Sequence, residues 1–114
     1  MVLRLLEFAD EIIQIGVDSL TVTVNAVDAL ILAQIVSGVN PQTLINNQLM
    51  GIKKVAKSDV TVKVNTVLIP EINANHVPNV AKTVSEMGAS IYNIILLIPQ
   101  HKISLVFHTA LRTD

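Results

Sequence analysis

The 114-residue sequence contains no cysteine, and this absence limits its chemistry first. Without thiolates the chain itself supplies no ligands for an iron–sulfur cluster, no cysteine nucleophile and no disulfide. Aromatic residues make up only 3% of the chain, so a base-stacking platform for nucleic acid is not expected. The 8 basic and 9 acidic residues form no long run of either sign, and a basic patch for phosphate backbones is therefore not expected either.

Long hydrophobic runs are also lacking. The longest stretch, Ile94–Pro99, has the length of a strand, and no membrane span is expected. Near the start, Arg4, Glu7 and Asp10 interrupt the apolar residues in the manner of an amphipathic helix and not of a secretory signal. We therefore expect a cytoplasmic protein.

Apolar residues are abundant in comparison. They make up 51% of the chain against 15% charged residues, whereas roughly 25% charged is usual for a soluble domain. The mean hydropathy is +0.57. Such a composition indicates surface that more chain or a partner covers.

Hydrophobic periodicity predicts alternating helices and strands. The expected helices are one that Gly16 ends and three more over residues 29–36, 41–57 and 77–87, and the expected strands are 19–25, 60–69 and 91–98. The expected helix starts are Asp28 and Asn40 with Pro41, and the expected later stops are Gly38 and Gly88. Gly51 lies within a helix at a cost of about 1 kcal/mol relative to alanine, which indicates close packing of that helix on the sheet.

The order of these elements is typical of a parallel sheet with right-handed crossovers. Runs of valine and isoleucine in the strands predict burial on both faces. A closed eight-stranded barrel needs about 250 residues, so the fold class predicted is α/β, as a partial TIM-type (βα) barrel. We expect about three to four parallel strands with helices on the outside. A short strand over 103–107, with no helix after it, is also predicted.

Asparagine recurs at a similar place in each strand. Thr21–Asn25 and Thr61–Asn65 agree at four of five positions and lie 40 residues apart, and Asn93 has a similar phase in the third strand. In α/β barrels ligand-binding residues gather at the carboxyl ends of strands, which makes these asparagines a candidate rim. Alternatively, they simply end strands and open turns.

Four segments in order resemble the radical S-adenosylmethionine domain of the NifB family, which builds the nitrogenase iron–molybdenum cofactor. They are Ile15–Asp28, Gln48–Ile52, Val62–Asn73 and Asn93–Pro99, within a likeness that runs from about residue 6 to 102. The resemblance implies a radical S-adenosylmethionine barrel, with S-adenosylmethionine and a [4Fe–4S] cluster as cofactors. It implies the nitrogenase cofactor assembly proteins as partners.

Two departures from the family limit what the resemblance implies for this chain. The three-cysteine motif that holds the cluster, which lies upstream of the first segment in the family, is absent, and after Lys102 the likeness stops. We therefore expect residues 1–102 to be a partial barrel segment and residues 103–114 a divergent tail. The expected function is that of a truncated NifB-like protein, inactive alone and without retained cofactors. The alternative is a non-catalytic α/β module that associates with itself or with a full-length relative, since an incomplete barrel leaves sheet edges bare.

Polar residues at the strand ends are the candidates for contact with the cofactor. By motif position in the resemblance they are Asn25, Asn65, Thr66 and Asn93. No catalytic residue and no metal ligand is predicted, because His76, His101 and His108 lack a ligand spacing.

Overall fold

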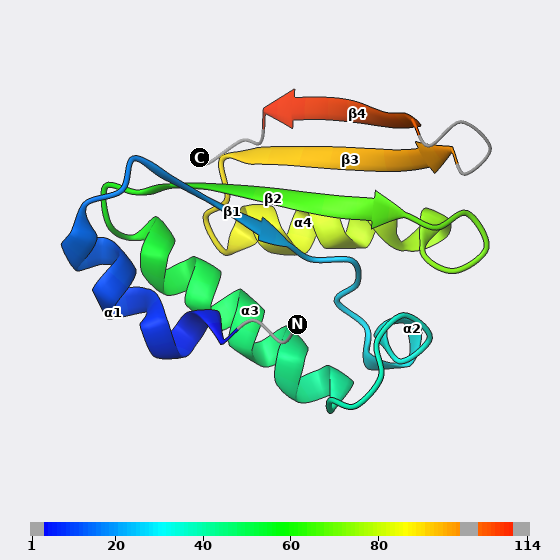
Figure 1. Ribbon diagram of the computed structural model, residues 1–114, viewed down its shortest axis with the longest axis horizontal. Coiled ribbons are helices and arrows are strands. Elements are labelled where there is room, and N and C mark those ends of the chain that lie inside the picture. Colours follow the sequence, from blue (N-terminus) through cyan, green and yellow to red (C-terminus); the bar gives the residue numbers. More distant parts are fainter. Residues whose placement is uncertain (1–3, 99–102, 111–114) are drawn as a thin grey trace.

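The computed structural model describes the backbone of residues 4–98 and 103–110, and the side chains of residues 4–96 (Figure 1). The helices are α1 (Leu5–Ile15), α2 (Ala29–Leu32), α3 (Pro41–Ala56), the 3-10 turn η1 (Ala74–His76) and α4 (Val77–Glu86). The strands are β1 (Ser19–Thr23), β2 (Thr61–Leu68), β3 (Ile91–Ile98) and β4 (Ile103–Ala110). In the described part of the chain no helix is long and apolar enough to cross a membrane.

The four strands form one sheet in the order β1-β2-β3-β4. The pairs β1–β2 and β2–β3 are parallel, which confirms the predicted parallel sheet for three strands. Three parallel strands lie within the predicted three to four, and the further strand β4 runs antiparallel to β3 along its whole length. Residues 99–102 alone separate the two strands, and a parallel crossover needs about a dozen residues or more.

Both predicted helix starts are confirmed. The Oδ1 atom of Asp28 accepts hydrogen bonds from the backbone N–H groups of Leu30 at 2.9 Å and Ile31 at 3.2 Å. Asn40 Oδ1 accepts from the N–H of Thr43 at 3.0 Å, with the proline following directly as the first helical residue. These side chains satisfy N–H groups that have no partner within their helices. The first of the two helices is nevertheless shorter than predicted, since α2 ends at Leu32.

The helices α1, α3 and α4 cover one face of the sheet (Figure 1). The core between them and the strands contains Leu5, Ala9, Val22, Val24, Ile52, Val55, Val62, Val64, Val80, Val84 and Tyr92. The intervening strand residues, among them Thr21 and Thr23, lie on the other face, which we call the open face. The prediction of burial on both faces is therefore wrong, since no second helix layer covers the open face within residues 4–98 and 103–110.

The glycine within α3 marks a close approach of two helices. A Cβ atom on Gly51 would lie 2.6 Å from Cγ of Leu5, a residue of α1 that is itself 2% exposed. Close packing at this position is as predicted, but its direction is not, because the contact joins α3 to α1 and not to the sheet.

Candidate functional site

Two of the predicted site residues meet on the open face. Asn65 of β2 and Asn93 of β3 are partners in the strand register, and Asn93 Nδ2 donates a hydrogen bond to Asn65 Oδ1 at 2.8 Å. Thr23 is the register partner of Asn65 on β1, and His108 is the register partner of Asn93 on β4. The row thus crosses all four strands, and we call it the amide row.

One atom of the amide row is unsatisfied. Asn93 Oδ1 is buried and has no hydrogen-bond partner in the described part of the chain. A buried carbonyl oxygen without a donor is uncommon in folded proteins, because it loses its hydrogen bonds to water and no protein donor replaces them. The amide row can therefore accept one further hydrogen bond at Asn93.

Asn25 lies two residues after the end of β1 and has a structural role. The last backbone bond between the two strands joins the N–H of Val24 to the carbonyl of Asn65 at 2.8 Å. Beyond it, Asn25 Oδ1 accepts from the N–H of Val67 at 2.8 Å, in place of a strand carbonyl. This bond agrees with the alternative that the asparagine ends its strand.

Thr66 lies on the opposite face from the asparagines. It is fully buried against the helices, donates its hydroxyl hydrogen to the carbonyl of Val24 at 2.6 Å and accepts from the Tyr92 hydroxyl at 2.7 Å. Successive residues of a strand point to opposite faces, so its position next to Asn65 was a sequence signal for this separation. The hydroxyl is used to join β1, β2 and β3 within the core.

Burial raises the pKa of the Tyr92 hydroxyl above its usual value near 10, and the hydrogen bond to Thr66 offsets part of that rise. The folded chain therefore keeps this proton at pH values where the unfolded chain loses it. The contribution to stability is complete below pH 10 and falls as the pH rises above 10, by at most about 1.4 kcal/mol per pH unit.

We expect Tyr92→Phe to remove this part of the alkaline loss. The free energy of unfolding, measured in urea from pH 8 upwards, should fall less steeply above pH 10 for the variant than for the original chain. The two proteins differ only at this hydroxyl, so the difference between their slopes reports Tyr92. Equal slopes would contradict the assignment.

Two residues for which the sequence predicted no role tie the ends of β1 and β2 together. Asn73 is fully buried, and its Oδ1 accepts from the N–H of Ile69 at 2.7 Å. Its Nδ2 donates to the carbonyls of Asn25 at 3.0 Å and Val67 at 2.9 Å. Nothing in the sequence distinguishes this asparagine from others in loops.

His76 is the second of these residues. It lies in the 3-10 turn η1 just before α4, where its Nε2 accepts from the N–H of Val27 at 3.0 Å. The side chain thereby holds the segment that leads from β1 to α2. His101 lies outside the described residues.

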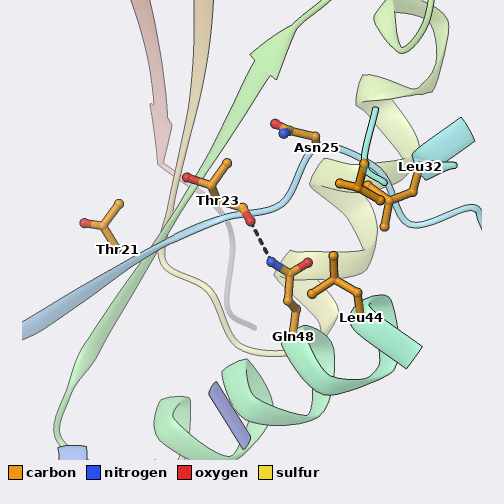
Figure 2. Close-up of a pocket in the computed structure, with 7 residues that line it drawn as sticks. Thr21, Thr23, Asn25, Leu32, Leu44 and Gln48 are labelled. Carbon is orange, nitrogen blue, oxygen red and sulfur yellow. Dashed lines mark hydrogen bonds between the residues drawn. The ribbon is translucent and has the colours of Figure 1, made fainter. Parts of the chain in front are cut away.

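A cavity of about 380 Å³ opens beside β1 (Figure 2). Its lining residues are Thr21, Thr23, Asn25, Leu32, Val36, Leu44 and Gln48. Inside it, Gln48 Nε2 donates to the backbone carbonyl of Thr23 at 2.8 Å. Hydroxyl, amide and alkyl groups can form hydrogen bonds and apolar contacts, but none of them is an ionisable group for acid–base chemistry.

Sequence comparison identifies proteins that are similar to this chain, although no family model matches it. The FeMo cofactor biosynthesis protein NifB of Methanocaldococcus jannaschii is 42% identical over 113 residues, covering 90% of this chain and 37% of that protein. The protein of the same name from Methanocaldococcus infernus is 40% identical over 111 residues, covering 88% of this chain and 36% of that protein. Over this segment the chain belongs to the NifB family. The NifB protein of Klebsiella pneumoniae is 37% identical over 105 residues, which cover 81% of this chain and 22% of that protein.

These matches confirm the resemblance that the four ordered segments indicated. The chain spans little more than a third of the two Methanocaldococcus NifB proteins, at 37% and 36% of their lengths. Its three parallel strands and their helices are compatible with a partial (βα) unit. Closure into a radical S-adenosylmethionine barrel stays a prediction, as does the division of the chain at residue 102.

Proposed function

We propose that this chain acts in FeMo cofactor biosynthesis as a NifB-type scaffold segment, without cluster chemistry of its own. The observation that carries the proposal is the similarity to NifB proteins over 81–90% of the chain, in a sequence that contains no cysteine. The similarity to NifB supports a role in FeMo cofactor biosynthesis. The absence of cysteine supports the view that the chain alone has no cluster-dependent activity.

The residues of this chain do not fit the iron–sulfur cluster that the family resemblance implies. Such clusters are held by cysteine thiolates, and the sequence has none. In the described part of the chain no three histidine, aspartate or glutamate side chains lie together as a metal site either. We therefore assign no reaction step to a cluster on this chain.

For S-adenosylmethionine we propose Asn65 and Asn93 as the contacts this segment would supply. They lie on the open face, which corresponds to the inner face of a barrel because the helices cover the other side. The free acceptor Asn93 Oδ1 suits an amino group of an adenine or of an amino acid. Thr66 is a weaker candidate because it is buried on the opposite face, and Asn25 is weaker because its Oδ1 bonds to the backbone of β2.

The partners that follow from this proposal are the nitrogenase cofactor assembly proteins or a full-length NifB relative. Such a partner would provide the cysteine thiolates that this sequence lacks. It would also provide the further strands that a closed barrel needs beyond this sheet. The amide row would then contact a ligand only within such an assembly.

Anaerobic reconstitution tests the proposal. The purified chain, incubated with iron and sulfide, should gain no visible cluster absorption and should release no 5′-deoxyadenosine from S-adenosylmethionine. The NifB protein of M. jannaschii, treated in parallel, is the positive control for the procedure. A cluster spectrum with S-adenosylmethionine cleavage by the chain alone would contradict its inactivity. In the source organism, deletion of the gene should lower the yield of FeMo cofactor, and an unchanged yield would contradict the pathway.

A further inference from the structure

The outer edge of β1 carries unpaired backbone groups. Within the described residues β1 is the first strand of the sheet and has a neighbour on one side only. The N–H of Val24 bonds to β2, and so does the carbonyl of Asp18, which accepts from Thr61. Since the backbone groups of successive residues alternate in direction, those of Ser19, Thr21 and Thr23 point away from β2. They form a row of donors and acceptors that can pair with another strand.

Gln48 occupies part of this edge. Its side chain is 7% exposed, and its Nε2 donates to the outward carbonyl of Thr23 at 2.8 Å (Figure 2). Its neighbours on the same face of α3 are apolar, among them Ile45 and Ile52. Burying a polar side chain among apolar ones costs free energy unless the side chain forms a hydrogen bond. Here the bond supplies the N–H that a neighbouring strand would otherwise provide.

The space beside this edge suits an extended chain. The cavity of about 380 Å³ borders Thr21 and Thr23 and is backed by the apolar side chains of Leu32, Val36 and Leu44. The opposite flank of the parallel strands is different, because β4 already pairs with β3 along eight residues. Among the residues that the structure describes, β1 is therefore the parallel strand whose outer edge has no strand beside it.

The β1 sequence is complementary to itself. In an antiparallel pair centred on Thr21, Thr21 lies opposite Thr21 of a second copy, and Ser19 lies opposite Thr23. All three are small hydroxyl residues on the open face, and such cross-strand pairs are favourable. Ser19–Thr23 contains no lysine and no proline, the residues that usually protect an edge strand.

We propose that the outer edge of β1 pairs antiparallel with the same edge of a second copy of this chain, and that Gln48 competes with this pairing. In the pair, the carbonyl of Thr23 accepts from the N–H of Ser19 of the second copy. That is the carbonyl to which Gln48 donates. Because the Gln48 side chain also lies in the space beside Thr21 and Thr23 that the second strand would enter, pairing displaces its bond in both copies. The proposal is independent of the function proposed above.

The test is the dissociation constant of the dimer, measured by analytical ultracentrifugation. Gln48→Met keeps the length and packing of the side chain and removes its donor. One competing bond is lost in each copy, so the dissociation constant should fall about 5- to 150-fold relative to the original chain. Gln42→Met is the matched control, because Gln42 is an exposed glutamine of the same helix whose amide bonds only to Asn46. It should leave the constant unchanged.

A second variant locates the contact. Proline at Thr21 removes an N–H that points outward and makes no bond to β2, which edge strands tolerate. Thr21→Pro combined with Gln48→Met should restore the monomer, with an unchanged far-ultraviolet circular dichroism spectrum. Equal dissociation constants for Gln48→Met and Gln42→Met would overturn the proposal. So would dimers that survive Thr21→Pro, or growth into larger species, since a two-fold pair closes at the dimer.

Discussion

Replacing Asn73 with alanine is expected to lower the free energy of unfolding by about 3–5 kcal/mol. The side chain is fully buried and makes three hydrogen bonds to backbone groups of two separate segments. Its loss leaves one N–H and two carbonyls without partners at the ends of β1 and β2. Each such buried group costs about 1–3 kcal/mol, and water entering the new space recovers part of this.

The measurement is urea denaturation followed by circular dichroism. Asn75→Ala is the matched control, because Asn75 is an exposed asparagine of the same loop. Its change should stay within about 0.5 kcal/mol, as is usual for surface positions. A similar small change for Asn73→Ala would show that these three bonds do not hold the strand ends.

The second large effect concerns Gly51. Alanine in place of glycine within a helix usually stabilises by about 0.5–1 kcal/mol. Here we expect the opposite sign, a loss of about 1–3 kcal/mol, because the added Cβ would meet the buried Leu5 side chain at 2.6 Å. The two helices would have to separate or Leu5 would have to leave its rotamer.

Unfolding in urea distinguishes the two signs directly. Met50→Ala, at the neighbouring and 49% exposed position of α3, controls for helix propensity and should change stability by less than about 0.5 kcal/mol. A combined Gly51→Ala and Leu5→Ala variant should lose less than the sum of the two single changes, since the smaller residue removes the clash. If Gly51→Ala stabilised the chain, the space between α1 and α3 would be large enough for the added methyl group, and the expected clash with Leu5 would be wrong.

The structural bonds found here also bear on how the NifB-type segment would work. Asn25, Asn73 and His76 fix the carboxyl ends of β1 and β2 through hydrogen bonds to backbone groups. Asn65 is therefore presented from a strand whose carboxyl end is held in place.

Much of the local structure followed from the sequence alone. Asp28 and Asn40 start helices because their short side chains accept from free N–H groups, and this depends only on neighbours in the chain. The parallel order of β1, β2 and β3 followed from the alternation of strands and helices. Membership of the NifB family over this segment also followed from residues in order.

Only the tertiary structure decided which distant groups meet. The contact of Gly51 with Leu5, the bonds of Asn73 and the bond from Gln48 to Thr23 join residues that no local pattern relates. These contacts depend on how helices cross and where a strand ends, which many neighbours determine together.

The conclusion from the missing cysteines follows from the sequence by itself, and the structure does not change it. Their absence removes the ligands of a cluster whatever the fold is, because no other side chain of this sequence is a soft thiolate donor. Whether the remaining polar residues form a site was a different matter. The structure placed Asn65 and Asn93 side by side on the open face and put Thr66 in the core, because alternate residues of a strand face opposite sides and helices cover only one of them.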